Sequence, residues 1–349
     1  MRIGLIAPPW VPVPPTTYGG TELIVDLLAR GLAAGGHEVV LWTTGDATCP
    51  VDRRWVHVRP PRPMSEAVPE AFHVLSAYEA MDDVDLVHDH TTLGPLLARQ
   101  RPGLPVVATS HGPFTEQTRK LYAAAAGRVH LVAVSHAQAL SAQPDVEVDA
   151  VIPHGLDVDA FPVGAGDGGY ALFLGRMTPE KGVHVAIDAA RRAGVPILVA
   201  AKCREDAEQA YFDEAVRPRL GPDAEYLGEV GGAEKLALLG GARVLVNPIR
   251  WPEPFGLVMA EALACGTPVV AGPHGAAPEI VAEGRTGFLC EGVEALAEAI
   301  HAAAGLDRSA CRRDAEECLS VGRMVAEHEA LYAALLAEGT LDLGAARAS

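Results

Sequence analysis

The sequence predicts an α/β fold made of two Rossmann-like domains, each built on a doubly wound parallel sheet. Its length of 349 residues exceeds one ordinary core and suits two domains of roughly 150 to 180 residues. Short aliphatic or β-branched runs alternate with segments of helical periodicity, as in a parallel sheet covered by helices on both faces. This series occurs twice, separated by a Gly-, Asp- and Pro-rich stretch at residues 154–169, which marks a domain boundary.

The first series predicts an N-terminal domain over residues 1–155. Apolar residues recur at helical spacing in Thr21–Ala34 and Phe114–Ala126, which are therefore expected to be helices. Between such segments lie short apolar runs bounded by Gly, Pro or Asp. The predicted strands are Arg2–Ala7, Glu38–Thr43, Asp85–His88, Pro105–Thr109, His130–Val134 and Asp149–Pro153.

The second series predicts a C-terminal domain over residues 156–322. Its strands are expected at Tyr170–Leu174, Ile197–Ala201, Glu225–Leu227, Val244–Val246, Pro268–Val270 and Gly287–Leu289. Its helices are expected to open near Lys181, Arg204, Ala233, Gly256, Ala276 and Val293. Residues 323–349 are expected to return to the first domain, with Arg323–Leu336 as a helix and the last dozen residues as a frayed tail.

Composition narrows the class of protein. A formal net charge of −17 argues against nucleic acid as a partner, because such binders need a basic surface. No apolar run approaches the roughly 20 residues that span a bilayer, and Pro8 and Pro9 interrupt the first apolar run too early for a secretory signal. The six cysteines contain no C-x-x-C pair, which argues against disulfides and structural zinc and favours the cytoplasm.

A group of arginines surrounds Trp55, comprising Arg53, Arg54, Arg59 and Arg62. These side chains could contact an acidic acceptor or an anionic lipid surface. Solvated arginines on an exposed loop are the simpler interpretation and the one we favour. At most, we expect peripheral contact with a membrane.

A first candidate site for an anion is the segment YGGTE, which follows the first strand and opens a helix. Glycine lets main-chain amides approach a phosphate closely, and a helix N-terminus favours negative charge. Gly19 and Gly20 are therefore candidate donor-binding residues, although a simple tight turn would have the same sequence. No G-x-G-x-x-G follows the first strand, so a nicotinamide cofactor is not indicated.

A second candidate site begins at the first strand of the second domain. Arg176 follows that strand, and Lys181 opens the next helix in PEKG. The carboxyl ends of parallel strands border the ligand crevice of open α/β sheets, so two cations there could hold a diphosphate. Solvated surface charges remain the alternative.

The most informative segment is NPIRWPEPFGLVMAE, from Asn247 to Glu261. Its prolines preclude a regular helix before Gly256. Glu253 thus lies in a loop, whereas Glu261 lies inside a helix, roughly 7 to 8 Å along the axis from Gly256 at 1.5 Å per residue. The two carboxylates should contact different parts of a ligand, and free amides between them could face an anion. These amides belong to Phe255, Gly256 and Leu257.

These motifs together resemble family 4 of the retaining glycosyltransferases, which have the GT-B fold of two Rossmann-like domains. The resemblance rests on E-x₇-E within EPFGLVMAE, on YGGTE, on GRMTPEKG and on GPHGAAPEIVAEGRTGFL, in this order along nearly the whole chain. It implies an N-terminal acceptor domain, a C-terminal domain for a nucleotide-sugar donor, and a final helix that returns to the first domain. It also implies a donor, UDP-sugar by family habit, and neither a cofactor nor a required metal.

The resemblance assigns roles to single residues. Glu253 would contact hydroxyls of the transferred sugar, and Glu261 the ribose. Arg176 and Lys181 would neutralise the diphosphate. The amides of Gly19 and Gly20 and those of Phe255–Leu257 would assist them. His111 would lie near the donor sugar and the reacting centre. Near the base would be Leu227 and Glu229.

The sequence departs from the family pattern in two places. His154-Gly155 stands where the family often has Asn-Gly, and Gly275-Ala276-Ala277 stands where two glycines often precede Pro-Glu. Either departure could alter contacts at the hinge or at the phosphates.

His88 and His90 raise a separate question, because residues i and i+2 of a strand face the same way. With His111 they could form a metal site. A histidine pair at a strand end would equally suit an acceptor site, and we favour that interpretation.

Three other functions compete with sugar transfer: a sugar-nucleotide epimerase, a glycan phosphorylase with pyridoxal phosphate, and a non-catalytic protein that binds sugar nucleotides. The E-x₇-E context favours transfer. Within the family, the short length and the Ala-, Gly- and Arg-rich composition suggest an actinobacterial member, and the chain is similar in size to family-4 enzymes of avilamycin-type orthosomycin biosynthesis. That similarity implies an antibiotic or another glycoconjugate as acceptor.

Overall fold

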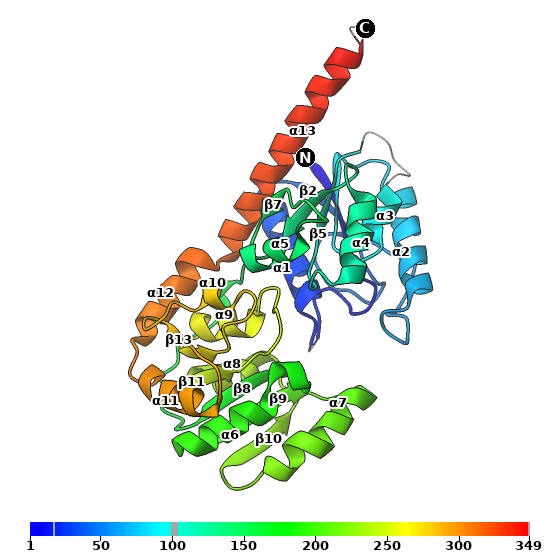
Figure 1. Ribbon diagram of the computed structural model, residues 1–349. Coiled ribbons are helices and arrows are strands. Elements are labelled where there is room, and N and C mark those ends of the chain that lie inside the picture. Colours follow the sequence, from blue (N-terminus) through cyan, green and yellow to red (C-terminus); the bar gives the residue numbers. More distant parts are fainter. Residues whose placement is uncertain (17, 99–103, 348–349) are drawn as a thin grey trace. The chain divides into compact units, whose positions relative to one another are not determined.

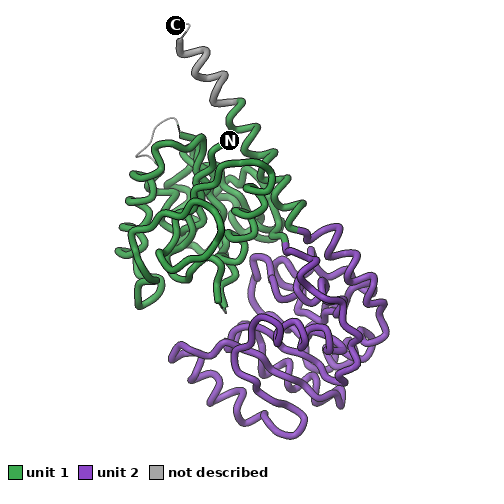
Figure 2. The backbone as a smooth tube through the Cα atoms, turned by 180° about the vertical axis from the view of Figure 1, so that it is seen from behind, with its two compact units in different colours: residues 1–155, 321–349 green, residues 156–320 purple. Residues whose placement is uncertain are grey.

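The computed structural model describes residues 1–16, 18–98 and 104–347, with side chains described up to residue 337. The chain forms two compact units (Figure 2). Unit 1 contains residues 1–155 and 321–349, and unit 2 contains residues 156–320. Unit 1 is therefore discontinuous in sequence, because unit 2 is inserted between its last strand and its last helix.

Unit 1 is built on a seven-stranded sheet in which neighbouring strands run parallel, in the order β3-β2-β1-β4-β5-β6-β7. The central strands are almost entirely buried, as expected when helices cover both faces of a parallel sheet. The strands are β1 (Arg2–Ile6), β2 (Glu38–Trp42), β3 (Asp52–Arg54), β4 (Leu86–Asp89), β5 (Val106–Thr109), β6 (His130–Ala133) and β7 (Ala150–Val151).

Helices of unit 1 pack their apolar faces on this sheet and on one another. The long C-terminal helix, red in Figure 1, packs on the first helix of the chain. Gly31 permits this contact, because a Cβ there would lie 2.3 Å from Cγ2 of Val325. The helices are α1 (Gly20–Ala34), α2 (Ala67–Ala80), α3 (Gly94–Leu97), α4 (Glu116–Ala125), α5 (His136–Ala142) and α13 (Val321–Arg347).

Unit 2 is built on a six-stranded parallel sheet with the order β10-β9-β8-β11-β12-β13. Numbered from its own first strand, this order is 3-2-1-4-5-6, that of a dinucleotide-binding Rossmann sheet. The order reverses at β8, and ligands of such sheets bind beyond the carboxyl ends of the strands at that point. The strands are β8 (Ala171–Arg176), β9 (Ile197–Lys202), β10 (Ala224–Gly228), β11 (Val244–Asn247), β12 (Val269–Ala271) and β13 (Gly287–Leu289).

The helices of unit 2 enclose a second hydrophobic core centred on β8 and α6. The α-helices are α6 (Val183–Ala193), α7 (Asp206–Tyr211), α8 (Gly232–Gly241), α9 (Leu257–Ala264), α10 (Ala277–Ile280), α11 (Val293–Ala303) and α12 (Arg308–Cys318). Single turns of other helix types are η2 (Val158–Ala160), η3 (Pro179–Lys181), η4 (Phe212–Val216) and η5 (Arg217–Arg219).

The predicted fold class, two doubly wound parallel sheets, is confirmed. Two local features differ from the prediction. Strand β3 was missed, because its sequence Asp-Arg-Arg has none of the apolar character of the other strands. The predicted frayed tail largely belongs to α13, which runs to Arg347, because each residue added to an existing helix needs only propagation. Residues 348–349 of that tail lie outside the described part.

Candidate functional site

The structure brings together two of the predicted site residues of unit 2. Lys181 ends the turn η3 that follows β8, and Glu253 lies in the loop between β11 and α9. The ammonium of Lys181 forms an ion pair with Oε2 of Glu253, and the two side chains are only 15% and 11% exposed. A cation and a carboxylate far apart in the sequence thus form one largely buried pair at the switch point of the sheet.

Trp251 contacts both members of this pair. Its indole Nε1–H donates to Oε2 of Glu253 over 3.0 Å, and Nζ of Lys181 lies 5.2 Å from the centre of its ring. The ring face attracts the ammonium by a cation–π interaction. Oε2 of Glu253 therefore receives two donors, one charged and one neutral.

Main-chain contacts hold the two loops of this site together. The amide of Arg250 donates to the carbonyl of Glu180 over 2.8 Å. Gly182 has φ +75°, and a Cβ there would lie 2.5 Å from the carbonyl oxygen of Pro248. Only glycine fits both the left-handed backbone and this close approach.

The segment that departs from the family pattern supports Glu253 from another side. Gly275 has φ +57°, and a Cβ there would lie 2.2 Å from the carbonyl oxygen of Glu253. The amide of Ala276 donates to that same carbonyl over 2.9 Å. The backbone that carries Glu253 is therefore fixed by β12–α10 as well as by its own loop.

Arg176 ends β8 beside this site. Its Nε is buried and has no hydrogen-bond partner among the described residues, and the same is true of Oγ1 of Thr178. Buried donors without partners are rare in folded proteins. Two such atoms within three residues indicate a position where a ligand could supply acceptors.

Helix α9 begins at Leu257, as the sequence predicted, after Gly256 at its N-cap with φ +94°. Phe255 is buried. In the first turn of α9 the amide of Met259 donates to the carbonyl of Gly256 over 3.0 Å, whereas the earliest amides of a helix in general have no acceptor inside it. Glu261 is buried inside α9, where Oε1 accepts from Nζ of Lys235 over 2.7 Å. The second carboxylate of E-x₇-E thus has its own cation, supplied by α8.

The residues predicted near the base lie at and after the carboxyl end of β10. Leu227 belongs to that strand, and Glu229 follows it. The carboxylate of Glu229 pairs with Arg204 at 2.7 Å. Each of the three predicted glutamates of unit 2 therefore has a basic partner: Lys181, Lys235 and Arg204.

The glycine pair of unit 1 is placed at the start of α1, with Gly19 at the N-cap and Gly20 as the first helical residue. Gly19 has an extended backbone, and glycine is needed there because a Cβ would lie 2.7 Å from Cβ of Pro15. Glu22 in the first turn is 5% exposed. Burial raises its pKa to about 7, so this helix start carries a carboxyl group that holds its proton up to neutral pH.

His111 of unit 1 lies in the middle of a row of three imidazoles. Its Nε2 is 2.9 Å from Nδ1 of His90, and its Nδ1 is 3.3 Å from Nε2 of His154. The ring stacks on that of His154 with a centroid distance of 5.1 Å. His154, the other departure from the family pattern, thus directly contacts His111, the histidine predicted to lie near the reacting centre.

Two further histidines extend this group. Nδ1 of His88 is 2.6 Å from the hydroxyl of Tyr332, and its Nε2 is 2.7 Å from Oγ1 of Thr109. His328 of α13 packs 5.2 Å from His88, ring centre to ring centre. Burial lowers the pKa of all these imidazoles, to about 3 for His111 and about 4 for His328. They form a neutral cluster at ordinary pH.

The alternative of a metal held by His88, His90 and His111 does not fit these contacts. Both ring nitrogens of His88 are engaged with hydroxyl groups, and both of His111 with imidazoles. Among the side chains that the structure describes, in residues 1–16, 18–98 and 104–337, no three of His, Cys, Asp or Glu are arranged to hold a metal ion.

Two family models match the chain, one in each half. The model described as "Glycosyltransferase Family 4" matches residues 18–160, and the one described as "Glycosyl transferases group 1" matches residues 168–304. The chain is a glycosyltransferase of the GT-B type. This confirms that the chain contains glycosyltransferase domains, and it confirms the GT-B form of the predicted fold.

Curated relatives of this glycosyltransferase include two enzymes of Mycobacterium tuberculosis. The phosphatidyl-myo-inositol mannosyltransferase of Mycobacterium tuberculosis is 29% identical over 321 residues, which cover 83% of this chain and 82% of the relative. The glycogen synthase of Mycobacterium tuberculosis is 29% identical over 344 residues, which cover 79% and 80% of the two chains.

Solved structures resemble the glycosyltransferase over nearly its full length. A glycosyltransferase involved in avilamycin A biosynthesis is 27% identical with a TM-score of 0.74, and the match covers 97% of this chain and 98% of that one. An Anabaena protein solved in complex with UDP and glucose has a TM-score of 0.76 at 21% identity, covering 95% and 99%. The second likeness concerns the fold alone.

The sequence of the glycosyltransferase did not predict which basic residues pair with its glutamates, nor that the indole of Trp251 contacts Glu253. Trp251 stands inside the segment that we singled out, but nothing in its spacing indicates that its indole reaches Glu253. Lys235 and Arg204 lie outside every motif. Only one general rule could have pointed to these two basic residues: a buried carboxylate needs a hydrogen-bond donor.

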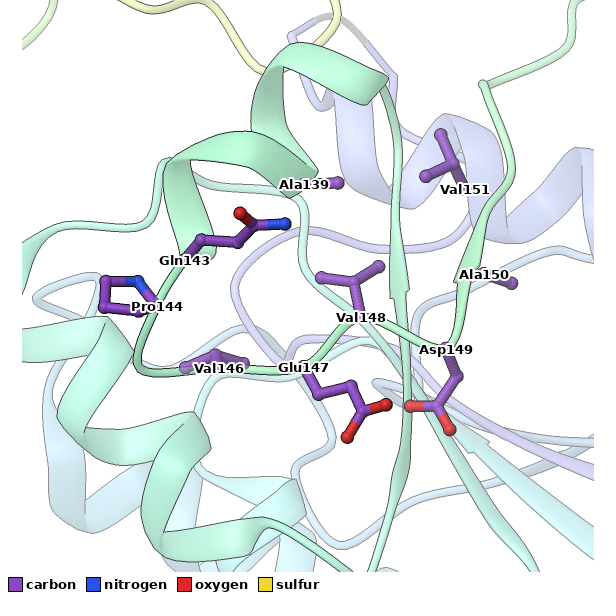
Figure 3. A pocket seen from close by; sticks show the side chains of 9 residues that line it. All are labelled: Ala139, Gln143, Pro144, Val146, Glu147, Val148, Asp149, Ala150 and Val151. Carbon is purple, nitrogen blue, oxygen red and sulfur yellow. The ribbon is translucent and has the colours of Figure 1, made fainter.

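Two hollows in unit 1 lie away from the predicted site residues. One, of about 530 Å³, is formed by α5 and the segment leading into β7 (Figure 3). The other, of about 600 Å³, lies at the amino ends of β5 and β6, opposite the end where His111 follows β5. The first is lined by Ala139, Gln143, Pro144, Val146, Glu147, Val148, Asp149, Ala150 and Val151.

The arginines around Trp55 are partly engaged in the fold. Arg53 donates to the carbonyl of Ala47, and Arg54 donates to the carbonyl of Ala80 over 2.7 Å. These two arginines therefore stabilise the β3 region instead of forming part of a free basic surface. In the chain as far as the structure describes it, no helix combines the length and apolar character needed to cross a membrane.

Proposed function

We propose that this glycosyltransferase transfers a sugar from a nucleotide diphosphate sugar to an acceptor hydroxyl with retention of anomeric configuration. The observation that carries the proposal is the buried pair of Lys181 and Glu253 between the end of β8 and the start of α9. One cation, one carboxylate and a helix N-terminus are the groups that a sugar diphosphate needs: charge for the phosphates and an acceptor for sugar hydroxyls.

Arg176 adds a second cation. Its buried Nε without a partner among the described residues is explained if a diphosphate oxygen supplies the missing acceptor. Lys181 and Arg176 would then stabilise the negative charge that develops on the departing phosphate, as preorganised electrostatic groups do. Amides of Phe255, Gly256 and Leu257 would assist, and amides of Gly19 and Gly20 would do so from unit 1.

In the proposed reaction, the acceptor oxygen forms a bond to the anomeric carbon while the bond from that carbon to the diphosphate oxygen breaks. The leaving group takes the electron pair, and the acceptor proton is released with the nucleoside diphosphate. Attack from the face that the diphosphate leaves retains the anomeric configuration. No metal ion is required, because the two cationic side chains supply the positive charge.

The other predicted residues receive roles consistent with their surroundings. Glu261 would accept from the ribose hydroxyls, with Lys235 neutralising it when no donor is bound. Leu227 and Glu229 would lie near the base. His111 of unit 1 would lie near the transferred sugar, and unit 1 would bind the acceptor.

The acceptor is proposed to be an antibiotic or another glycoconjugate, with the reaction in the cytoplasm. The similar glycosyltransferase of avilamycin A biosynthesis supports the antibiotic. The similarity to a phosphatidyl-myo-inositol mannosyltransferase supports the broader class of glycoconjugates.

A thermal-shift panel with UDP, GDP, ADP and dTDP tests the donor class. A nucleotide at about 100 times its Kd should add roughly 2.7 kcal/mol to the stability of the folded state. We expect one nucleotide, UDP, to raise the melting temperature clearly more than the others. If all four leave it unchanged at millimolar concentration, the chain is not a nucleotide-sugar transferase of this kind.

A retention test follows from the same panel. The sugar donor of the selected nucleotide, of known anomeric configuration, is incubated with acceptor mixtures, and the product is analysed by proton NMR. The coupling constant of the anomeric proton should show the configuration of the donor. An inverted product would refute the proposed stereochemistry, and an epimerised donor without transfer would refute the proposed reaction.

A further inference from the structure

Glu253 is charged and nearly buried, so it needs hydrogen-bond donors in every state of the enzyme. In the structure, its Oε2 has two of them, Nζ of Lys181 and Nε1–H of Trp251. Under the proposed function, on which this inference rests, Lys181 neutralises a diphosphate when the donor binds. The carboxylate then loses its charged partner at the moment when the substrate arrives.

The two donors differ in their freedom to leave. Lys181 has a flexible four-carbon side chain whose ammonium can turn to a new anion. Trp251 has a rigid ring on a short loop, and that loop is tied to η3 by the hydrogen bond from Arg250 to Glu180. The ammonium can move, whereas the indole stays.

We propose that Trp251 is a positioning residue that keeps Glu253 bonded and in place while Lys181 exchanges this carboxylate for the diphosphate of the donor. The indole N–H holds Oε2 throughout, and the ring face lies beside the path of the ammonium. Glu253 thereby remains oriented toward the sugar hydroxyls, which replace Lys181 as its second partner. The exchange costs less than it would with an unpaired carboxylate.

Binding of the nucleotide selected by the panel, measured by calorimetry, tests this role. Trp251→Phe keeps an apolar ring but removes the N–H. We expect it to weaken nucleotide binding by about 10- to 100-fold, the effect of one hydrogen bond to a charged group. Trp251→His restores a ring N–H and should recover part of the affinity.

A double-mutant cycle separates positioning from a merely structural role. In the Glu253→Gln background no charge has to be kept satisfied, so Trp251→Phe should then change affinity less than threefold. Equal losses in both backgrounds would overturn the proposal, because they would show that Trp251 acts independently of Glu253.

Fluorescence gives a second readout that does not depend on activity. Trp251 is the one tryptophan of unit 2, since the others are Trp10, Trp42 and Trp55. Nucleotide binding should change the emission, because Lys181 leaves its position over the ring, and the change should be lost in Trp251→Phe but kept in the matched control Trp55→Phe. If the nucleotide binds and the emission stays constant, the exchange of Lys181 is refuted.

The two proposals fail in different ways. If no nucleotide binds the wild-type protein, the proposed function is refuted. If nucleotide binds the wild-type protein and folded Trp251→Phe equally well, the proposed function stands and the role of Trp251 is refuted. Should Trp251→Phe not fold, the same comparison is made with Trp251→Leu, which also lacks the N–H, and nucleotide affinity within threefold of the wild type then refutes the role.

Discussion

Replacing Glu22 by glutamine should stabilise unit 1, and increasingly so as the pH rises. Burial raises the pKa of this carboxyl group from 4.5 to about 7. Between these values the unfolded chain has released the proton while the folded chain still holds it. The folded state binds more protons there, so the contribution of Glu22 to the free energy of unfolding falls as pH rises.

The size of the effect follows from the same values. Each unit of pKa corresponds to about 1.4 kcal/mol, so ionising the buried carboxyl costs up to about 3.4 kcal/mol at high pH. Between pH 5 and pH 8 the penalty grows by about 2.5 kcal/mol. Glutamine resembles the protonated acid in shape and carries no charge. The free energy of unfolding of Glu22→Gln should therefore exceed that of the wild type by about 2.5 kcal/mol more at pH 8 than at pH 5.

Urea unfolding at pH 5 and pH 8 measures that difference. Tryptophan fluorescence reports mainly on unit 1, because Trp10, Trp42 and Trp55 belong to it and only Trp251 belongs to unit 2. The exposed Glu79 on α2 provides the control, and Glu79→Gln should change stability by less than about 0.5 kcal/mol at both pH values. A gain from Glu22→Gln that is equal at both pH values would refute the reasoning, since it would show that Glu22 is not desolvated.

The remaining predictions concern both units. His328→Gln should make the free energy of unfolding less sensitive to acid. Burial lowers the pKa of His328 to about 4, so the stability that the neutral imidazole contributes is present above pH 6.5 and is lost as the pH falls. Urea unfolding should show a loss of about 2 kcal/mol at pH 5 in the wild type that is absent from the variant. Gly275→Ala should destabilise unit 2 by about 1 to 3 kcal/mol and lower the rate of sugar transfer more than about tenfold, because the Cβ of the alanine would clash with the main chain of Glu253. Gly194→Ala, with φ +65° but open space around it, should keep activity. Arg176→Ala or Lys181→Ala should lower turnover by about 100-fold with the fold intact, and wild-type turnover in the folded double mutant would refute their roles.

The sequence predicted the two sheets well because a parallel strand buried on both faces is a nearly continuous apolar run. Val106–Thr109 and Val244–Asn247 are such runs, and each was placed within one or two residues. Strand β3 escaped because an edge strand needs no apolar sequence when only one neighbour pairs with it. The start of α9 was predicted because proline and glycine determine the backbone locally.

Contacts within the candidate site were beyond reach for a physical reason. The pairing of Lys181 with Glu253 joins residues 72 positions apart, and that of His88 with Tyr332 joins residues 244 apart. Sequence spacing describes one strand or helix at a time. The first pair depends on how β8 lies beside β11 in unit 2, and the second depends on how α13 packs on β4 in unit 1. The motifs therefore indicated which residue types matter but not which partner each would find.

The insertion of unit 2 into unit 1 has a consequence for synthesis on the ribosome. The nascent chain emerges from its N-terminus, so residues 1–155 leave the ribosome long before α13, whose Tyr332 meets His88 in the finished unit. At about 5 to 20 residues per second, translation of the intervening segment takes roughly 8 to 33 seconds. Unit 2 is continuous in sequence and can fold during this interval. A chain released at residue 320 would thus carry the whole of unit 2 and an incomplete unit 1, with the face of α1 that Val325 covers left open to chaperones.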